Sequence, residues 1–281
     1  MLSYRHAFHA GNHADVLKHF VFTQVLAYFN QKEKPYWIID THAGAGLYRL
    51  DNGFSTQHAE WKNGIGKLWQ AEKLPTALQQ FLDIIQLACA QASQNLYPGS
   101  PFLARAVLRE HDKLRLCELH PTDYKILLDN FAGESKQTKI EMQSGFEAIK
   151  TYLPPPTKRA VILIDPPYEV KDDYKHVVAC LQDSIKRFAT GTYLVWYPLL
   201  QRAEPLLMVE ALKKRNPNNW LDVTLSVETP RQDGFGMFGS GMFLINPPWT
   251  LPNMLQASMP LLRDLLALDK TASFNLTHHI S

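Results

Sequence analysis

Short apolar runs alternate along this chain with longer segments in which apolar residues recur every three or four positions. Helical spacing first appears over residues 15–31, where Asp15 can cap the helix and Pro35 follows its end. The apolar run 36–40 comes next and predicts a strand buried on both faces, as in a parallel sheet. We therefore expect an amphipathic helix that leads directly into a central strand.

A regular succession of helices and strands resumes near residue 101. Helical spacing covers residues 101–109, 121–132, 145–152, 172–188 and 202–213, and apolar runs follow at 114–118, 139–142, 161–165, 191–197, 221–227 and 241–246. Such repeated units predict a doubly wound α/β fold with a mainly parallel sheet of seven strands. The last two runs can pair as a hairpin, and we expect 241–246 to be the last strand.

Residues 51–95 interrupt this alternation. Two stretches, 58–72 and 76–94, have helical spacing, and no strong strand lies between the central strand and residue 96. The segment is too long for an ordinary crossover. We therefore expect a main domain over 1–50 and 96–281, with a small helical insertion over 51–95.

The composition narrows the class of protein. Hydrophobic residues make up 46% and charged residues 20% of the chain, which excludes a disordered or fibrous protein. With 29 Lys and Arg against 27 Asp and Glu, the net charge is +2, so any nucleic acid must be bound by a local patch. Cys89, Cys117 and Cys180 lie far apart in apolar stretches, which favours buried free thiols in a reducing compartment. Since the chain lacks a membrane-length apolar run and a signal peptide, we expect a cytoplasmic protein.

The segment Asp165-Pro166-Pro167-Tyr168 follows a predicted strand, at the end where open α/β sheets bind their ligands. Asp165 and the carbonyl of Pro166 can accept the hydrogens of a planar amine, and Tyr168 can stack on its ring. This combination predicts methyl transfer to the N6 nitrogen of adenine or to a similar amine. The alternative is a turn that only ends the strand.

A second segment, Asn246-Pro247-Pro248-Trp249, has the same shape and also follows an apolar run. Strand order separates the two segments. Asp165 ends the fourth strand, close to the glycine loop, whereas Asn246 ends the last predicted strand, at the far side of the sheet. We therefore assign catalysis to Asp165 and turn chemistry to Asn246.

Three further features point to a nucleoside ligand. The glycine loop at 40–46, with Gly44, lets the backbone approach a ligand closely, and the missing third glycine argues against a dinucleotide. Glu118 ends the next strand, where an acidic residue commonly binds ribose hydroxyls, although a plain exposed carboxylate is the alternative. Ser100 can cap the following helix or contact a ligand.

The N-terminal segment 1–19 combines cationic, imidazole and aromatic side chains, namely Tyr4, Arg5, His6, His9, His13, Lys18 and His19. Aromatic rings stack on unpaired bases and cations bind phosphate, so this segment can be an RNA-binding arm. A solvated terminus is the other interpretation. No metal site is expected, because no cysteine or carboxylate completes a ligand set.

In their order and spacing, these segments together resemble the RlmJ family, bacterial methyltransferases that modify adenine N6 in 23S ribosomal RNA. The resemblance rests on residues 4–6, 13–19, 40–46, 97–101, 118–121, 165–168 and 246–249, and it spans nearly the whole chain. It implies a Rossmann-like methyltransferase fold with a small helical insertion, S-adenosylmethionine as donor and 23S ribosomal RNA as partner. We expect a monomer without a metal or a membrane anchor.

The resemblance also implies roles for individual residues. Asp165 would be the catalytic carboxylate, beside Pro166 and Tyr168, while Tyr4, His6 and Lys18 would position the RNA substrate. The cofactor would be contacted by His19, His42, Gly44, Ser100, Glu118, Ser144, Gly145 and Asp165. Ser144 stands where the family can carry Asp, and a serine accepts from the adenine amino group with less charge.

Two other functions stay open at this point. A DNA adenine-N6 methyltransferase would use the same site, and a non-catalytic RNA-binding protein could keep the fold. The N-terminal segment and the family resemblance favour RNA, and the intact Asp165-Pro166-Pro167-Tyr168 segment favours catalysis.

Overall fold

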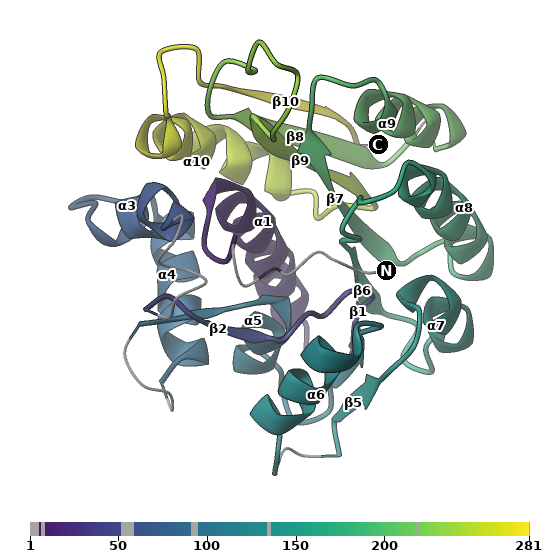
Figure 1. Cartoon of the computed structure of the whole chain (residues 1–281). Helices are drawn as coiled ribbons and strands as arrows, with labels where there is room; N and C mark the ends of the chain where they lie inside the picture. The colour runs from purple at the N-terminus through teal and green to yellow at the C-terminus, as the bar shows by residue number, and fades with distance from the viewer. Residues whose placement is uncertain are drawn as a thin grey trace.

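The computed structural model describes residues 6, 9–51, 59–90, 95–133, 136–216 and 218–280. A central sheet of eight strands runs in the order β10-β8-β9-β7-β6-β1-β4-β5, and helices pack on both of its faces (Figure 1). Its strands are β1 (Trp37–Asp40), β4 (Lys113–Cys117), β5 (Thr138–Glu141), β6 (Ala160–Ile164), β7 (Thr192–Leu199), β8 (Trp220–Ser226), β9 (Gly239–Ile245) and β10 (Ser273–His279). A second, two-stranded sheet pairs β2 (Leu47–Arg49) with β3 (Leu96–Pro98).

Strand direction divides the central sheet into two parts. The five strands from β5 to β7 are parallel, whereas β9 is antiparallel to both β7 and β8, and β10 is antiparallel to β8. From β1 the chain moves outward to β4 and β5 and then returns to β6 on the other side of β1. The prediction of a mainly parallel α/β sheet is confirmed, as is the hairpin of β8 and β9.

The expectation of seven strands is wrong, because the chain continues past β9 into α10 (Leu251–Leu266) and the edge strand β10. Residues 241–246 are therefore not the last strand. The side chains of β10 are exposed or half-buried, so its sequence lacks the continuous apolar run that marks a central strand. A search for apolar runs misses a strand of this kind.

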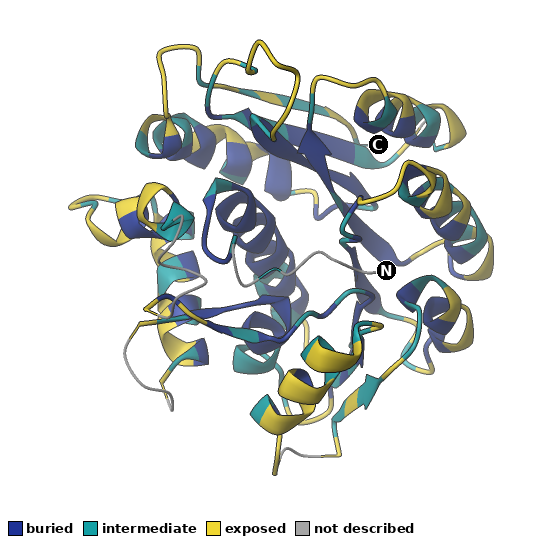
Figure 2. Ribbon diagram, in the orientation of Figure 1, coloured by how far each residue is buried: buried dark blue, intermediate teal, exposed yellow. Residues whose placement is uncertain are grey.

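Helix α1 (His13–Asn30) crosses the middle of the molecule and is buried on nearly all sides, as its dark colour in Figure 2 shows. It contacts α4 (Thr76–Ala88), α5 (Ser100–Ala106), α10 and β9. The prediction of an amphipathic helix with an exposed polar face is therefore wrong, because even Asp15 and Lys18 are buried. The helix is capped by Asn12 rather than by Asp15: the Asn12 side-chain oxygen accepts hydrogen bonds from two backbone amides at 3.0 Å.

The segment expected to form one helix over 58–72 instead forms a 3-10 helix, η2 (Glu60–Asn63), and the short helix α3 (Ile65–Trp69). Gly64 separates them, and a Cβ there would lie 2.0 Å from the carbonyl oxygen of Gly11. The close approach of these two backbones therefore interrupts the helix. The next helix, α4, ends at Ala88 rather than at 94. Apolar side chains of α3 and α4 join the same core cluster as those of α1.

The remaining helices are α6 (Pro121–Asn130), α7 (Gly145–Tyr152), α8 (Asp172–Arg187) and α9 (Glu204–Arg215). Helices α7, α8 and α9 share one apolar cluster, and α1, α4, α5 and α10 share the other, so the sheet has a separate core on each face. The three cysteines are free; Cys117 and Cys180 are buried and Cys89 is half-buried. Across the described residues, no helix is long and apolar enough to cross a membrane.

Candidate active site

A cavity of about 610 Å³ lies at the carboxyl edge of the parallel strands, where the strand order reverses beside β1. Its size is within the ordinary range for small-ligand pockets. It brings together every predicted site residue that the structure describes: His6, Lys18, His19, His42, Gly44, Ser100, Glu118, Ser144, Gly145, Asp165, Pro166 and Tyr168. Tyr4 lies outside the described residues.

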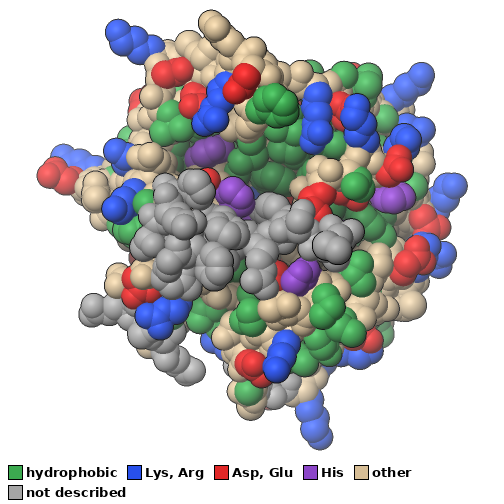
Figure 3. Space-filling model, in the orientation of Figure 1, with side chains coloured by type: hydrophobic (Ala, Val, Ile, Leu, Met, Phe, Trp, Pro, Cys, Tyr) green, Lys and Arg blue, Asp and Glu red, His purple; other side chains and the backbone are tan. Residues whose placement is uncertain are grey.

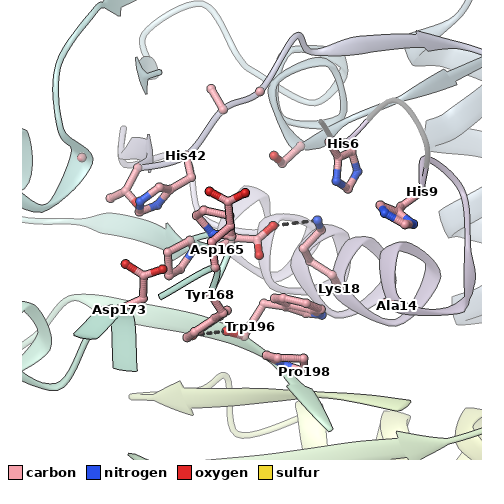
Figure 4. A pocket seen from close by; sticks show the side chains of 18 of the residues that line it. His6, His9, Ala14, Lys18, His42, Asp165, Tyr168, Asp173, Trp196 and Pro198 are labelled. Carbon is pink, nitrogen blue, oxygen red and sulfur yellow. Dashed lines mark hydrogen bonds and ion pairs between the residues drawn. The ribbon is translucent and has the colours of Figure 1, made fainter. Parts of the chain in front are cut away.

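The centre of the cavity holds an ion pair between Lys18 and Asp165. Lys18 Nζ donates a hydrogen bond to Asp165 Oδ2 at 2.7 Å, drawn as a dashed line in Figure 4. Burial alone would lower the pKa of the Lys18 ammonium, but Asp15 and Asp165 outweigh it and raise that pKa above its usual value. Burial raises the pKa of Asp165, and Lys18 opposes this shift. The pair thus favours the ionised form of a carboxylate that is poorly solvated.

Asp15 connects this ion pair to the N-terminal segment. Its Oδ1 lies 2.8 Å from Lys18 Nζ, and its Oδ2 accepts from the backbone amide of Gly11 at 2.9 Å and lies 2.8 Å from His6 Nε2. Burial would raise the pKa of Asp15, but His6, Lys18 and His19 hold it well below the usual range. Asp15 therefore remains an anion that fixes Lys18 and His6 together.

Sequence reasoning gave Asp15 only a capping role. The available signal was its spacing, because a carboxylate three residues before Lys18 and four before His19 shares a helix face with both. The tertiary fold adds the decisive fact that this face is buried at the cavity.

An aromatic wall stands beside Asp165. Tyr168 is only 3% exposed, and its hydroxyl donates to the carbonyl oxygen of Trp196 at 2.6 Å, the second dashed line in Figure 4. The Trp196 ring lies 6.0 Å from the Tyr168 ring, and Lys18 Nζ lies 5.8 Å from the Trp196 ring centroid. Trp196 was not predicted as a site residue, because within the apolar strand β7 it looks like a core side chain.

On the other side of the cavity, Glu118 and the glycine loop form a second polar group. The backbone amide of Gly44 donates to Glu118 Oε2 at 2.8 Å, and the amide of His120 donates to Oε1 at 2.6 Å. Burial raises the pKa of Glu118, and these two amides oppose the shift. The carboxylate is thus held rigidly at the cavity wall, with lone pairs left to accept further hydrogen bonds.

Ser100 is the first residue of α5. It does not cap this helix, because Gly99 occupies the capping position. Its hydroxyl donates to Asp40 Oδ2 at 2.6 Å. Asp40 is buried at the end of β1, and burial raises its pKa to about 6 in spite of the hydrogen bonds from Ser100 and His42. Ser100 therefore stabilises a buried strand-end carboxylate directly beneath the glycine loop.

Two histidines line the cavity in their neutral form. Burial lowers the pKa of His19 and of His42 to about 3. His19 Nδ1 lies 2.8 Å from the hydroxyl of Tyr97, and His42 Nδ1 lies 2.8 Å from that of Thr41. Neutral imidazoles can contact a positively charged ligand without repelling it.

Ser144 and Gly145 stand where α7 meets the loop after β1. A Cβ at Gly145 would lie 2.0 Å from the carbonyl oxygen of Thr41, so only glycine allows this approach. Ser144 precedes the helix and makes no capping hydrogen bond. Ser144 is one of the residues that line the cavity.

Residues 33–278 match the family model described as ribosomal RNA large subunit methyltransferase D, RlmJ. The chain belongs to this family. The resemblance drawn from the sequence motifs is thus confirmed.

Named relatives and a solved structure support membership of the RlmJ family. The chain is 43% identical over 266 residues to ribosomal RNA large subunit methyltransferase J of Escherichia coli K12, and this alignment covers 95% of this chain and 94% of that protein. It is 42% identical over 277 residues to the protein of the same name in Haemophilus influenzae, with 98% of each covered. The crystal structure of protein LPL1258 from Legionella pneumophila matches with a TM-score of 0.87 at 32% identity, covering 97% of this chain and 100% of that one.

In this RlmJ-family chain, Asn246 lies on the side of the sheet opposite the cavity, where the parallel strands begin. Since β9 is antiparallel to β7, its carboxyl end pairs with the beginning of β7, and the Asn246 side chain donates to the carbonyls of Ala189 and Gly191 at 2.8 Å. The assignment of turn chemistry to Asn246 is confirmed. The reason given for it is wrong, because β9 lies inside the sheet, and strand direction rather than strand order separates the two segments.

From His13 onward, the predicted arm over residues 1–19 belongs to the buried helix α1. Lys18 and His19 therefore act from a rigid helix and not from a separate arm. His6 and His9 precede the helix and line the cavity.

Proposed function

We propose that this protein transfers the methyl group of S-adenosylmethionine to the N6 nitrogen of an adenine in 23S ribosomal RNA. The observation that carries the proposal is the Asp165–Lys18 ion pair, placed in one cavity between the Tyr168–Trp196 wall and the Glu118 carboxylate. The Escherichia coli and Haemophilus influenzae relatives are named as large-subunit ribosomal RNA methyltransferases, and the alignments cover nearly the full length of each chain.

The cavity residues suit S-adenosylmethionine. Glu118 would accept hydrogen bonds from the ribose, Ser144 would accept from the adenine amino group, and the neutral His19 and His42 tolerate a sulfonium nearby. When bound, the cofactor supplies a methyl group that is already electrophilic, so no metal is needed to activate it. The work of the protein is then to position the amine and to orient its lone pair.

The target adenine would leave its stack and enter against Tyr168 and Trp196. Asp165 Oδ2 is bonded to Lys18, so we assign Oδ1, together with the carbonyl of Pro166, as acceptors for the hydrogens of N6. Accepting these hydrogens returns electron density to a nitrogen whose lone pair is otherwise delocalised into the ring. The nitrogen becomes acidic only as it gains the methyl group, and its proton then leaves to Asp165 or to water.

The test is to incubate the protein with protein-free 23S ribosomal RNA and methyl-labelled cofactor, and to digest the RNA to nucleosides. We expect the label in N6-methyladenosine. A DNA stem-loop of the same sequence is the matched control. Equal labelling of DNA would support a DNA methyltransferase instead, and no label in either nucleic acid would leave a non-catalytic binding protein.

Ser144→Asp tests the placement of the cofactor adenine. A charged acceptor strengthens a hydrogen bond by about 1 kcal/mol, so we expect cofactor binding to tighten by roughly fivefold. Calorimetric titration with S-adenosylhomocysteine measures this, with Ser144→Ala as the control that should weaken binding slightly. Equal affinities of the Asp, Ala and wild-type proteins would place the adenine elsewhere.

A further inference from the structure

The loop between β8 and β9 lies at the mouth of the cavity. Gly239, the first residue of β9, pairs with both Leu199 and Ser226, so the loop lies at the same side of the sheet as the carboxyl end of β7. Met237 of this loop and Arg202 of the segment after β7 both line the cavity. Figure 1 shows the two segments side by side at the top of the molecule.

This loop presents Phe235 to solvent. The Phe235 side chain is 77% exposed and stands between Gly234 and Gly236, both of which have positive φ. The turn is held by hydrogen bonds within the loop: the Phe235 amide donates to Asp233 Oδ1 at 3.0 Å, and the Gly234 amide donates to the carbonyl of Arg231 at 3.0 Å. The exposed ring therefore belongs to a turn that is held by hydrogen bonds, and it is not part of either core cluster.

Cationic side chains accompany the ring. Arg231 is exposed and forms no ion pair with any residue that the structure describes, and a Cβ at Gly236 would lie 3.8 Å from its Nε. Arg202 is also exposed, with its guanidinium 5.8 Å from the Tyr174 ring centroid. Figure 3 shows Lys, Arg and hydrophobic side chains, with some acidic ones, above the hollow at the centre of the view.

An exposed aromatic ring beside exposed guanidinium groups is the combination that binds unpaired nucleotides, because the ring stacks on a base and the cations hold phosphates. We propose that Phe235, Arg231 and Arg202 form a docking surface for the single-stranded RNA that flanks the target adenine. This inference rests on the proposed function and adds a second contact, across the mouth from His6 and Lys18. A single ring beside two arginines fits RNA better than an apolar protein partner, which would need a wider apolar patch.

The test compares Phe235→Ala with Trp249→Ala. Trp249 is 70% exposed and follows β9 at the opposite edge of the sheet, so it is a matched exposed aromatic residue outside the docking surface. The probe is a 23S ribosomal RNA transcript and then a hairpin fragment around the adenine that the wild-type protein methylates. Affinity is measured by fluorescence anisotropy, and kcat and KM by methyl incorporation.

We expect Phe235→Ala to raise the RNA Kd and KM by about 5- to 150-fold, the loss of one stacked base, with little change in kcat or in cofactor affinity. Phe235→Trp should restore binding, and Trp249→Ala should bind RNA as the wild type does. Arg231→Gln should reduce the slope of log Kd against log salt by about 1.

The two levels of inference fail separately. If the wild-type protein methylates no adenine in the transcript, the proposed function is wrong. If the wild-type protein is active and Phe235→Ala binds RNA with unchanged affinity, only the docking surface is wrong. A change of oligomeric state in Phe235→Ala without a change in RNA affinity would likewise overturn it in favour of a protein interface.

Discussion

Two segments of this protein with a similar sequence lie in opposite environments. Asp165-Pro166-Pro167-Tyr168 and Asn246-Pro247-Pro248-Trp249 each follow an apolar strand, and each contains a residue with positive φ, Tyr168 at 52° and Asn246 at 51°. Yet Tyr168 is 3% exposed at the wall of the cavity, whereas Trp249 is 70% exposed at the other edge of the sheet. Two segments of similar sequence can therefore serve chemistry in one place and a turn in the other.

Strand direction accounts for the difference. Strand β6 is parallel to β1, so Asp165 emerges beside the glycine loop and meets Lys18 from α1. Strand β9 is antiparallel to β7, so Asn246 emerges at the opposite edge and bonds two backbone carbonyls of the turn before β7. Ligand binding at the carboxyl ends of parallel strands thus applies only to the first segment.

An alanine substitution at each of the two positions tests this comparison most sharply. Asp165→Ala should reduce kcat by about 10²- to 10⁴-fold, since it removes the group that accepts the amine hydrogens. Asn246→Ala should leave kcat intact and lower the free energy of unfolding by about 1–3 kcal/mol, because two carbonyls lose their donor. Methylation assays and urea unfolding measure the two effects, and an inactive but stable Asn246→Ala protein would reverse our assignment.

Lys18→Met should have the next largest effect. Without the ammonium, kcat should fall about 10- to 100-fold, from loss of a charge-assisted contact worth roughly 1.5–3 kcal/mol. Burial raises the pKa of Asp165 and Lys18 lowers it, so removing Lys18 raises that pKa further. The acid limb of the pH profile of kcat, where Asp165 becomes protonated as the pH falls, should therefore move to higher pH.

The matched control for Lys18→Met is Lys213→Met. Lys213 Nζ pairs with the buried Asp222 at 3.0 Å, and neither residue lines the cavity. This variant should alter stability without moving the pH profile. An identical shift in both variants would show that general charge, and not the Lys18–Asp165 pair, sets the acid limb.

Asp40 offers the smallest and most indirect test, through stability rather than catalysis. It ends β1 at the same edge as Asp165, and burial, with a contribution from Asp165, raises its pKa from 3.8 to about 6. Because the pKa of Asp40 is higher in the folded protein than in the unfolded chain, its contribution to the free energy of unfolding is full below about pH 4. That contribution is lost as the pH rises through about 6. We therefore expect Asp40→Asn to become progressively more stable relative to the wild type over this range, by up to about 3 kcal/mol.

Urea unfolding of both proteins at several pH values between 4 and 7 measures this difference. Asn246→Asp is the counterpart at the opposite end of the strands, where the carboxylate would face two carbonyl oxygens instead of the hydroxyl and amide donors that Asp40 has. A constant difference between Asp40→Asn and the wild type across the range would show that Asp40 titrates normally in the folded protein.

Much of the fold followed from apolar patterning, because central strands and buried helices need continuous or periodic apolar residues. The same patterning failed for β10, whose exposed or half-buried residues resemble a loop. It also failed for α1, which reads as amphipathic because Asp15, Lys18 and His19 are polar, although all three are buried. Polar residues whose partners come from distant segments cannot be separated from surface residues by periodicity.

By itself, the sequence determined the family, the α/β class and the residue types at the strand ends, since each depends on local order: Asp165, Glu118 and the glycine loop are recognisable where they stand. Only the tertiary structure decided that Lys18 from α1 pairs with Asp165, that Asp15 holds Lys18, and that Trp196 joins the wall of the cavity. It also decided which Pro-Pro segment faces the cavity. The physical reason is that charge pairing and burial depend on strand direction and on contacts between residues far apart in the chain, and neither is written in a local pattern.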